Sequence, residues 1–401
     1  MLKNKTIVLG VTGGIAVYKA ADIVSRLKKL NANVEVVMTE GATEFVTPLT
    51  FQTLSNNVVH RKMFNEITNY DVEHISLAQK ADLILIAPAT ANTIGKIANG
   101  IADNLLTTVV MASTAKVVFA PAMNTKMYQN PIVQSNIEKL KSLGYEFINP
   151  AKGKLACGDY GEGKMAEPVD IVDYVISSFK EKDLIGRKIV VTAGPTIEPL
   201  DPVRYMTNHS SGKMGYSIAK EALDRGAEVV LISGSTCLEP PKGVELVRVK
   251  TTEDMLNAVG KYFATCDVLI KSAAPVDYRP ESVSSSKIKK NKDTDELTIK
   301  YVKNPDIAAH FGKFKKNQIM VGFAAETENL LQYAEAKLKE KNFDFIVAND
   351  VSKVGAGFNV DTNIISIIDN KGETTNYPIM DKAQVARIIL DKVKKLLDYK
   401  G

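Results

Sequence analysis

Short apolar runs alternate with amphipathic stretches along the first part of the chain. Apolar, β-branched runs stand at 6–11, 34–38, 83–87 and 117–120, and a helical pattern follows the first of them up to about Leu30. Strands that are apolar on both faces and separated by helices are typical of a parallel sheet covered on both sides. The pattern predicts an open, Rossmann-like α/β domain.

The same pattern starts again after the charged segment 179–183. The second half predicts strands at 188–193, 228–232 and 268–271, a helix near 215–225, an antiparallel pair at 364–369 and 374–378, and a last helix over 382–398. We therefore predict two open parallel-sheet α/β domains, 1–180 and 187–401. They share an architecture without being close sequence repeats.

Composition narrows the classes of protein to consider. The 401 residues are 45% hydrophobic and 24% charged, which is ordinary for a globular protein. No stretch approaches the roughly 18 apolar residues of a membrane span, and the chain enters a strand just after Met1, so a cytoplasmic location without membrane association is expected. A net charge of +5 without a basic, aromatic stripe favours anionic small substrates over nucleic acid.

The glycine turns after the first strand of each half do not match G-x-G-x-x-G. The first turn reads G-x-x-G-G at 10–14, and Thr39 rather than an acid ends the second strand. Both features count against a nicotinamide dehydrogenase, which needs an acidic group on the ribose. A phosphate could still bind to backbone N–H groups at the start of the following helix.

Cys157 lies in the glycine-rich segment 156–165, which predicts a mobile loop rather than a strand or helix. A thiol on a flexible polar loop is placed for chemistry, although an inert surface thiol is the alternative. Cys157, Cys237 and Cys266 have no metal-ligand spacing.

Three further groups in the first half are candidates for one site. His74, before an expected helix and the third strand, is a candidate acid/base, with a solvated loop histidine as the alternative. Thr90 and Asn92 follow the third apolar run, and Asn124 follows the fourth. Because ligands bind at the carboxyl ends of parallel strands, these loops are expected to surround one ligand.

Six motifs of the first half occur in a fixed order: T-G-G-I-A, E-H-I-S-L, A-P-A-T-A-N, A-D-N-L-L, P-A-M-N-x-x-M and A-C-G-D-x-G-E-G-K-M. In this order they resemble the homo-oligomeric flavin-containing cysteine decarboxylases, phosphopantothenoylcysteine decarboxylase above all, over residues 5–175. The resemblance implies an FMN site at Gly13, Gly14, Ile15, Ala16, Thr39, Thr90 and Asn92. It also implies three catalytic side chains: His74 as acid/base, Asn124 on the substrate carboxylate, and Cys157 as a proton donor.

The second half carries polar segments at the ends of its strands. Residues 204–216 precede a helix and suit an anion, a subunit contact or an ordinary N-cap. Asp277 follows the 268–271 strand, and 284–290 predicts a flexible basic flap or a merely solvated charge run. Lys337 and Lys341 lie four apart on one helix face, which could also be a plain exposed face.

The motifs of this half are T-A-G-P-T, T-N-H-S-S-G-K-M-G, A-A-x-x-D-Y-R-P, K-I-K-K, K-N-P-D-I and G-F-A-A-E-T. Over 187–395 they resemble phosphopantothenate–cysteine ligases. The resemblance implies CTP as the activating nucleotide and an acyl-cytidylate that is attacked by cysteine. It assigns Asn208 to the acyl-cytidylate, Lys287 to the triphosphate, and Asp277 to the nucleotide or its Mg²⁺. The implied CTP site also includes Pro305, Asp306, Ile307, Ala308, Phe323, Lys337 and Lys341.

Together the two resemblances imply a bifunctional enzyme of coenzyme A biosynthesis that acts on 4'-phosphopantothenate, L-cysteine and CTP. They also imply a homo-oligomer, with trimeric contacts in the first domain and dimeric contacts in the second. Tyr128 replaces the family's usual tryptophan, and Pro275-Val276 stands where Val-Ala is frequent. A flavin-binding regulatory subunit is the rival interpretation, and it predicts loss of the cysteine that is present here at 157. His60, His310, Cys237 and Cys266 receive no role.

Overall fold

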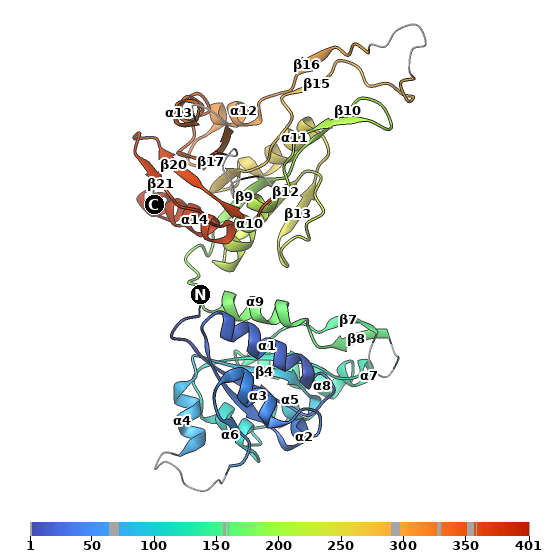
Figure 1. Ribbon diagram of the computed structural model, residues 1–401, viewed down its shortest axis with the longest axis vertical. Helices are drawn as coiled ribbons and strands as arrows, with labels where there is room; N and C mark the ends of the chain where they lie inside the picture. Colours follow the sequence, from blue (N-terminus) through green and yellow to red (C-terminus); the bar gives the residue numbers. More distant parts are fainter. Residues whose placement is uncertain are drawn as a thin grey trace. The chain divides into compact units, whose positions relative to one another are not determined.

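The computed structural model describes residues 2–63, 72–154, 158, 160–289, 297–326, 330–350, 357 and 359–400. The chain divides into two compact units, Met1–Phe179 and Lys180–Gly401, and each is described by itself (Figure 1). Within the described residues, no helix combines the length and the apolar character that a membrane crossing requires.

The first unit is built on a six-stranded sheet with the order β3-β2-β1-β4-β5-β6. All of its pairings are parallel, as predicted. Its strands are β1 (Thr6–Val11), β2 (Asn33–Met38), β3 (Val59–His60), β4 (Leu83–Ala89), β5 (Lys116–Pro121) and β6 (Glu146–Phe147). The strand order reverses between β1 and β4, which is where ligands bind in doubly wound sheets.

Helices cover both faces of this sheet. They are α1 (Val17–Lys29), α2 (Glu40–Thr43), α3 (Pro48–Ser55), α4 (Glu73–Lys80), α5 (Ala91–Ala98), α6 (Leu105–Ala112), α7 (Thr125–Tyr128), α8 (Pro131–Ser142) and α9 (Pro168–Ser178). Ile7 and Leu9 of β1 pack with α1, α3 and α9, while Val8 packs with α4, α5, α6 and α8. Successive residues of a strand point to opposite faces, so two cores are filled from one apolar run.

One prediction for this unit is wrong in part. Tyr160–Lys164 of the glycine-rich segment form strand β8, which pairs antiparallel with β7 (Ala151–Lys154). The alternation that marks a strand is present, but glycines occupy its buried positions, Gly161 and Gly163. A Cβ on Gly163 would lie 2.3 Å from the carbonyl oxygen of Met123. Close approach to the turn after β5 therefore requires glycine, and the glycine conceals the strand from a hydrophobicity pattern.

The second unit has an eight-stranded sheet with the order β13-β12-β9-β14-β17-β18-β20-β21. The first six strands are parallel: β9 (Lys188–Ala193), β12 (Glu228–Ser233), β13 (Glu245–Arg248), β14 (Val268–Lys271), β17 (Ile319–Glu326) and β18 (Phe345–Asp350). The last two, β20 (Ile365–Asp369) and β21 (Thr374–Asn376), are antiparallel. The predicted terminal hairpin is confirmed.

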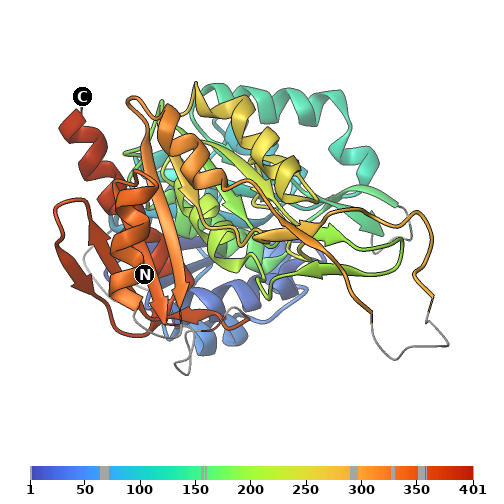
Figure 2. The same ribbon diagram turned by 90° about the horizontal axis from the view of Figure 1, so that it is seen from above.

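Helices again cover both faces of the sheet. α10 (Lys213–Asp224) and α14 (Lys382–Lys400) pack on one face, and α11 (Thr252–Phe263), α12 (Ile307–Phe314) and α13 (Leu330–Glu340) on the other. Two short ribbons, β10 (Ile197–Pro199) with β11 (Tyr205–Thr207) and β15 (Tyr278–Pro280) with β16 (Tyr301–Lys303), extend together from this body (Figures 1 and 2). A third pair joins β19 (Thr362–Asn363) to β22 (Met380–Asp381).

Residues 180–186 pack on the second unit. Leu184 is fully buried in the core beneath α10 and α14. Asp183 receives two hydrogen bonds from the guanidinium of Arg225, and Lys180 forms ion pairs of 2.7 Å with Glu221 and with Asp224. Residues 180–186, which the sequence marks only as charged and weakly periodic, therefore form the edge of the second core.

Candidate functional sites

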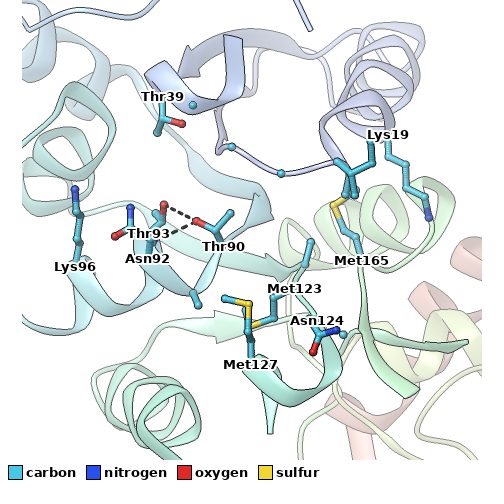
Figure 3. Close-up of a pocket in the computed structure, with 18 of the residues that line it drawn as sticks. Lys19, Thr39, Thr90, Asn92, Thr93, Lys96, Met123, Asn124, Met127 and Met165 are labelled. Carbon is cyan, nitrogen blue, oxygen red and sulfur yellow. Dashed lines mark hydrogen bonds between the residues drawn. The ribbon is translucent and has the colours of Figure 1, made fainter. Parts of the chain in front are cut away.

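A cavity of about 1080 Å³ opens at the carboxyl ends of β1, β2, β4 and β5 (Figure 3). The described residues that line it include every residue of the expected FMN site, together with Asn124: Gly13, Gly14, Ile15, Ala16, Thr39, Thr90, Asn92 and Asn124. They come from four loops that are distant in sequence, and the sheet brings them to one edge. The volume is that of a site for a cofactor-sized ligand.

The turn after β1 needs glycine for a steric reason. A Cβ on Gly13 would lie 2.7 Å from the carbonyl carbon of Gly41, at the start of α2. The two backbones therefore approach more closely than any side chain allows. Thr39 fixes the second backbone, because its N–H donates to the carbonyl of Val11 over 3.0 Å. Ile15 is 61% exposed and gives the cavity an apolar wall.

Threonine hydroxyls hold the turn after β4 in place. The Thr12 hydroxyl donates to the carbonyl of Pro88 over 2.7 Å, and the N–H of Thr90 donates to the Thr12 hydroxyl over 3.1 Å. Thr90 in turn caps α5 and lies 3.2 Å from the Thr93 hydroxyl (Figure 3). The network fixes the position of Thr90 at the cavity before any ligand is bound.

Asn124 caps the short helix α7, and its side-chain oxygen accepts from the N–H of Lys126 over 2.8 Å. Strand β8 lies against this turn, since the N–H of Met123 donates to the carbonyl of Gly163 over 3.0 Å. Tyr128 at the end of α7 is half-buried against the core beneath α5, α6 and α8, so an aromatic ring fits at this position. Cys157 lies outside the described residues.

The cavity also has cationic walls that the sequence analysis missed. Lys19 and Lys164 line it and both pair with Glu167, at 3.0 and 2.9 Å. Hydrogen bonds from Lys164 and Lys19 hold the pKa of Glu167 below its usual range. Lys96 lines the opposite side and pairs with Asp103 over 2.6 Å. The sequence does carry one indication that Lys19 lines the cavity, since Lys19 lies about one helical turn after the glycine motif.

His74 does not line this cavity in the described part of a single chain. It was expected just before a helix, but it is the second residue of α4, which begins at Glu73. An acidic residue in the first turn favours a helix start there. His60, which had no role, holds this helix: its ring contacts Glu73 through Nδ1 and Glu35 through Nε2, the latter over 3.4 Å.

A second cavity, of about 200 Å³, lies at the carboxyl ends of β14 and β17 in the second unit. Its described lining includes these residues of the expected nucleotide site: Asp277, Pro305, Asp306, Ile307, Ala308, Phe323, Lys337 and Lys341. Lys271, Lys303 and Asn304 also line it and were not assigned to it. Lys341 pairs with Asp306 over 2.9 Å, although it lies one residue beyond the end of α13.

Asn208 and Lys287 are not among the described lining residues. The Asn208 amide donates to the carbonyls of Ala274 and Pro275, at 3.2 and 3.0 Å, and Pro275 does line the cavity. Lys287 is exposed, and its neighbour Ile288 donates its N–H to Asp201 over 3.1 Å. Asn208 therefore borders the cavity, whereas Lys287 lies on the exposed basic segment and forms no hydrogen bond or ion pair with the described lining residues.

Asp201 holds the start of the basic segment. Burial alone would raise its pKa, but hydrogen bonds from the backbone N–H groups of Val203, Ile288 and Arg204 keep the pKa well below the usual range. The Pro275-Val276 departure is also accommodated. The Val276 N–H donates to the Thr196 hydroxyl over 2.9 Å, and its carbonyl accepts from Asn304 over 2.8 Å.

Neither unit contains a group of three or more metal-ligating side chains among the described residues. Asp277 is an exposed single carboxylate, and Asp306 is already paired with Lys341. Mg²⁺ is commonly held by one or two carboxylates together with the phosphates of a nucleotide. The described residues of this cavity fit a Mg²⁺ that enters bound to the nucleotide.

Comparison with known proteins shows to which family the chain belongs. The family described as Flavoprotein matches residues 1–180, and the one described as DNA/pantothenate metabolism flavoprotein C-terminal domain matches 184–397. The "Coenzyme A biosynthesis bifunctional protein CoaBC" of Bacillus subtilis is 47% identical, covering 100% of this chain and 99% of the relative. Its namesake in Escherichia coli is 44% identical, with 100% and 99% covered.

The chain belongs to this family of coenzyme A biosynthesis bifunctional proteins. Membership in this family confirms the resemblance that the motifs indicate. It also excludes the alternative of a nicotinamide dehydrogenase. Two solved structures are also similar. The C-terminal domain of a CoaBC protein is 43% identical over 54% of this chain and 99% of its own, with a TM-score of 0.47. "The FMN binding protein AtHal3" is 35% identical over 44% and 97%, with a TM-score of 0.39.

The His60 contacts predict a pH dependence of stability. Burial lowers the pKa of His60, but the hydrogen bonds that its ring donates to the carboxylates of Glu35 and Glu73 outweigh burial and raise the pKa above the ordinary value. A raised pKa stabilises the folded state fully below about pH 6.5, and that stability is lost as pH rises through the folded-state pKa. His60→Gln should therefore cost about 1 kcal/mol near pH 5.5 and less near pH 8.5.

Urea unfolding followed by flavin release and by circular dichroism measures this difference across the pH range. His310→Gln is the matched control, since His310 is exposed and its ring lies against the rings of Phe311 and Phe314. A cost of His60→Gln that is constant with pH would contradict the charged His60.

Proposed function

We propose that the chain joins cysteine to 4'-phosphopantothenate with CTP in its second unit and decarboxylates the product with FMN in its first. The observation that carries the proposal is the pair of cavities at the carboxyl ends of two separate parallel sheets, in a member of the coenzyme A biosynthesis bifunctional family. The described lining of each cavity includes most of the residues expected to bind the FMN or the nucleotide, whereas His74, Asn208 and Lys287 lie outside these linings.

The residues of the first cavity fit FMN. The glycine turn brings backbone N–H groups to the start of α1, where a phosphate is favoured, and Lys19 adds a cation. Ile15 and Met127 are apolar, exposed and able to flank a planar ring. FMN, when bound, would supply a reversible two-electron oxidation of the substrate, so that the oxidised substrate can accept the electron pair left behind when CO₂ departs.

This chain's own side chains orient the substrate and move protons. The Asn124 amide, fixed by its cap on α7, is suited to donate to the carboxylate that leaves as CO₂. His74 is assigned to proton transfer near the reacting thiol, and Cys157 to a later proton donation.

In the second cavity, Lys337 and Lys341 supply positive charge and Asp277 an oxygen ligand for a nucleotide-bound Mg²⁺. Phe323 gives a flat apolar wall, and residues 305–308 start the helix α12. Lys287, from the exposed basic segment, would neutralise charge on the triphosphate, and Asn208 would hold the activated acyl group.

We also propose that a second copy of the chain completes the first site. Asn124 lines the cavity whereas His74 does not, and both are assigned to one reaction. In a ring of subunits, one subunit can present α4 to the cavity of the next. This supports the trimeric contacts proposed for the first unit; dimeric contacts are proposed for the second.

Turnover of the full chain with 4'-phosphopantothenate, cysteine and each nucleoside triphosphate in turn tests the function. CO₂ should appear only when cysteine and CTP are both present, and pyrophosphate should precede it. Lys287→Gln should slow pyrophosphate release about 100- to 1000-fold, since one charged contact in a transition state is worth roughly 3–4 kcal/mol.

Lys289→Gln is the matched control, because Lys289 is also exposed and lies two residues away. Decarboxylation of preformed phosphopantothenoylcysteine should be unchanged in both variants. Equal pyrophosphate release by the Lys287 and Lys289 variants would overturn the assignment of Lys287.

Mixed oligomers test the shared site. His74→Asn and Asn124→Ala should each abolish CO₂ release from preformed substrate. In oligomers assembled from equal amounts of both variants, one half times one half, or about a quarter, of the sites should combine an intact His74 with an intact Asn124 from the neighbour. Mixed oligomers with no CO₂ release would show that both residues act within one chain.

A further inference from the structure

Lys271 is the last residue of β14, and its side chain lines the second cavity. The three residues before it, Val268, Leu269 and Ile270, are fully buried in the cores on the two faces of the sheet. The buried strand thus ends in a cationic residue, Lys271, that lines the proposed nucleotide site. None of the expected roles in this site belongs to Lys271.

The charges around Lys271 do not neutralise it. Asp306, the stronger of the two carboxylates that attract Lys271, already pairs with Lys341 over 2.9 Å and caps α12 by accepting from the N–H of Ala309 over 3.0 Å. Among the described residues, the Lys271 ammonium has no hydrogen bond and no ion pair. Asp277 attracts it as well, and Lys341 repels it.

Positive groups outnumber negative ones among the described residues that line the cavity. Its described lining includes four lysines, at 271, 303, 337 and 341, and two aspartates, at 277 and 306. Four positive groups against two negative ones leave two positive charges when all are ionised. An excess of this kind is matched by an anion that enters the cavity, and a nucleotide triphosphate carries its negative charge on its phosphates.

Without such an anion, burial makes the charged form of Lys271 unfavourable in free energy. Burial lowers the pKa of Lys271 to about 8, against the attraction of Asp306. Near pH 8 the free enzyme therefore contains both protonated and neutral Lys271. An opposite charge placed nearby favours the charged form, so a bound phosphate would draw a proton onto the nitrogen.

We propose that Lys271 binds the phosphates of the nucleotide and takes up a proton when the nucleotide binds. The proposal rests on the nucleotide site of the proposed function. An ammonium has three donors and no acceptor, which suits phosphate oxygens. Lys271 thereby adds a phosphate contact from a residue that lines the cavity, whereas Lys287 belongs to the exposed basic segment.

Titration calorimetry of the full chain with Mg²⁺ and CTP near pH 8 tests this. The observed heat is compared in two buffers of different ionisation enthalpy, which reports the number of protons exchanged. The wild type should take up a proton in a fraction of its sites. Lys271→Met should abolish the uptake and weaken CTP binding about tenfold or more.

Lys271→Arg separates charge from proton uptake. Arginine is always protonated, so this variant should recover most of the affinity and show no uptake. Lys313→Met is the control for loss of one exposed lysine on α12, outside the cavity, and should behave as the wild type. Thermal unfolding of each variant shows that it is folded.

Two further titrations identify the phosphate. Pyrophosphate should reproduce the Lys271-dependent proton uptake, whereas 4'-phosphopantothenate alone should not. Uptake with 4'-phosphopantothenate only, or equal CTP affinity and uptake in the wild type and Lys271→Met, would overturn the proposal. A wild type that binds no CTP would instead contradict the nucleotide site of the proposed function.

Discussion

Burial of both faces of a parallel sheet is the constraint on which the rest of this structure depends. Every residue of β4 is buried, and in the second sheet β9 and β14 are buried except at their terminal residues Lys188 and Lys271. Polar groups are costly inside such strands, so they are confined to the points where the strands end. In each unit these points meet at one edge of the sheet, and the cavities described above lie there.

This constraint explains how much could be predicted from the sequence. The strand at 268–271 has the predicted bounds, and the runs at 6–11 and 188–193 are likewise strands, because each is a continuous apolar stretch. The residues that follow the strands, such as Thr90 and Asn124, could be grouped around one cavity for the same reason. Glycine at the buried positions of β8 carries no such signal, and there the prediction failed.

The features that were not predicted depend on contacts between segments that are distant in sequence. His60 contacts Glu35 and Glu73, which lie on other elements and come together only when β2, β3 and α4 have packed. Lys19 and Glu167 are separated by most of the first unit. Lys271 could have been noticed as a cation that ends an apolar strand, but that no described residue pairs with it is a property of the folded cavity. Neighbouring residues alone do not determine such contacts.

The central claim is that two self-contained units carry the two reactions, and separate expression of the units tests it most directly. Fragments 1–179, 180–401 and 187–401 would be assayed for flavin, for CO₂ release from preformed substrate and for CTP-dependent pyrophosphate release. The account predicts that 1–179 retains flavin and decarboxylates, and that 180–401 ligates. It also predicts that 187–401 is less stable than 180–401, because it lacks Leu184 and the Asp183 contacts to Arg225. Fragments that fold or act only when recombined would contradict it.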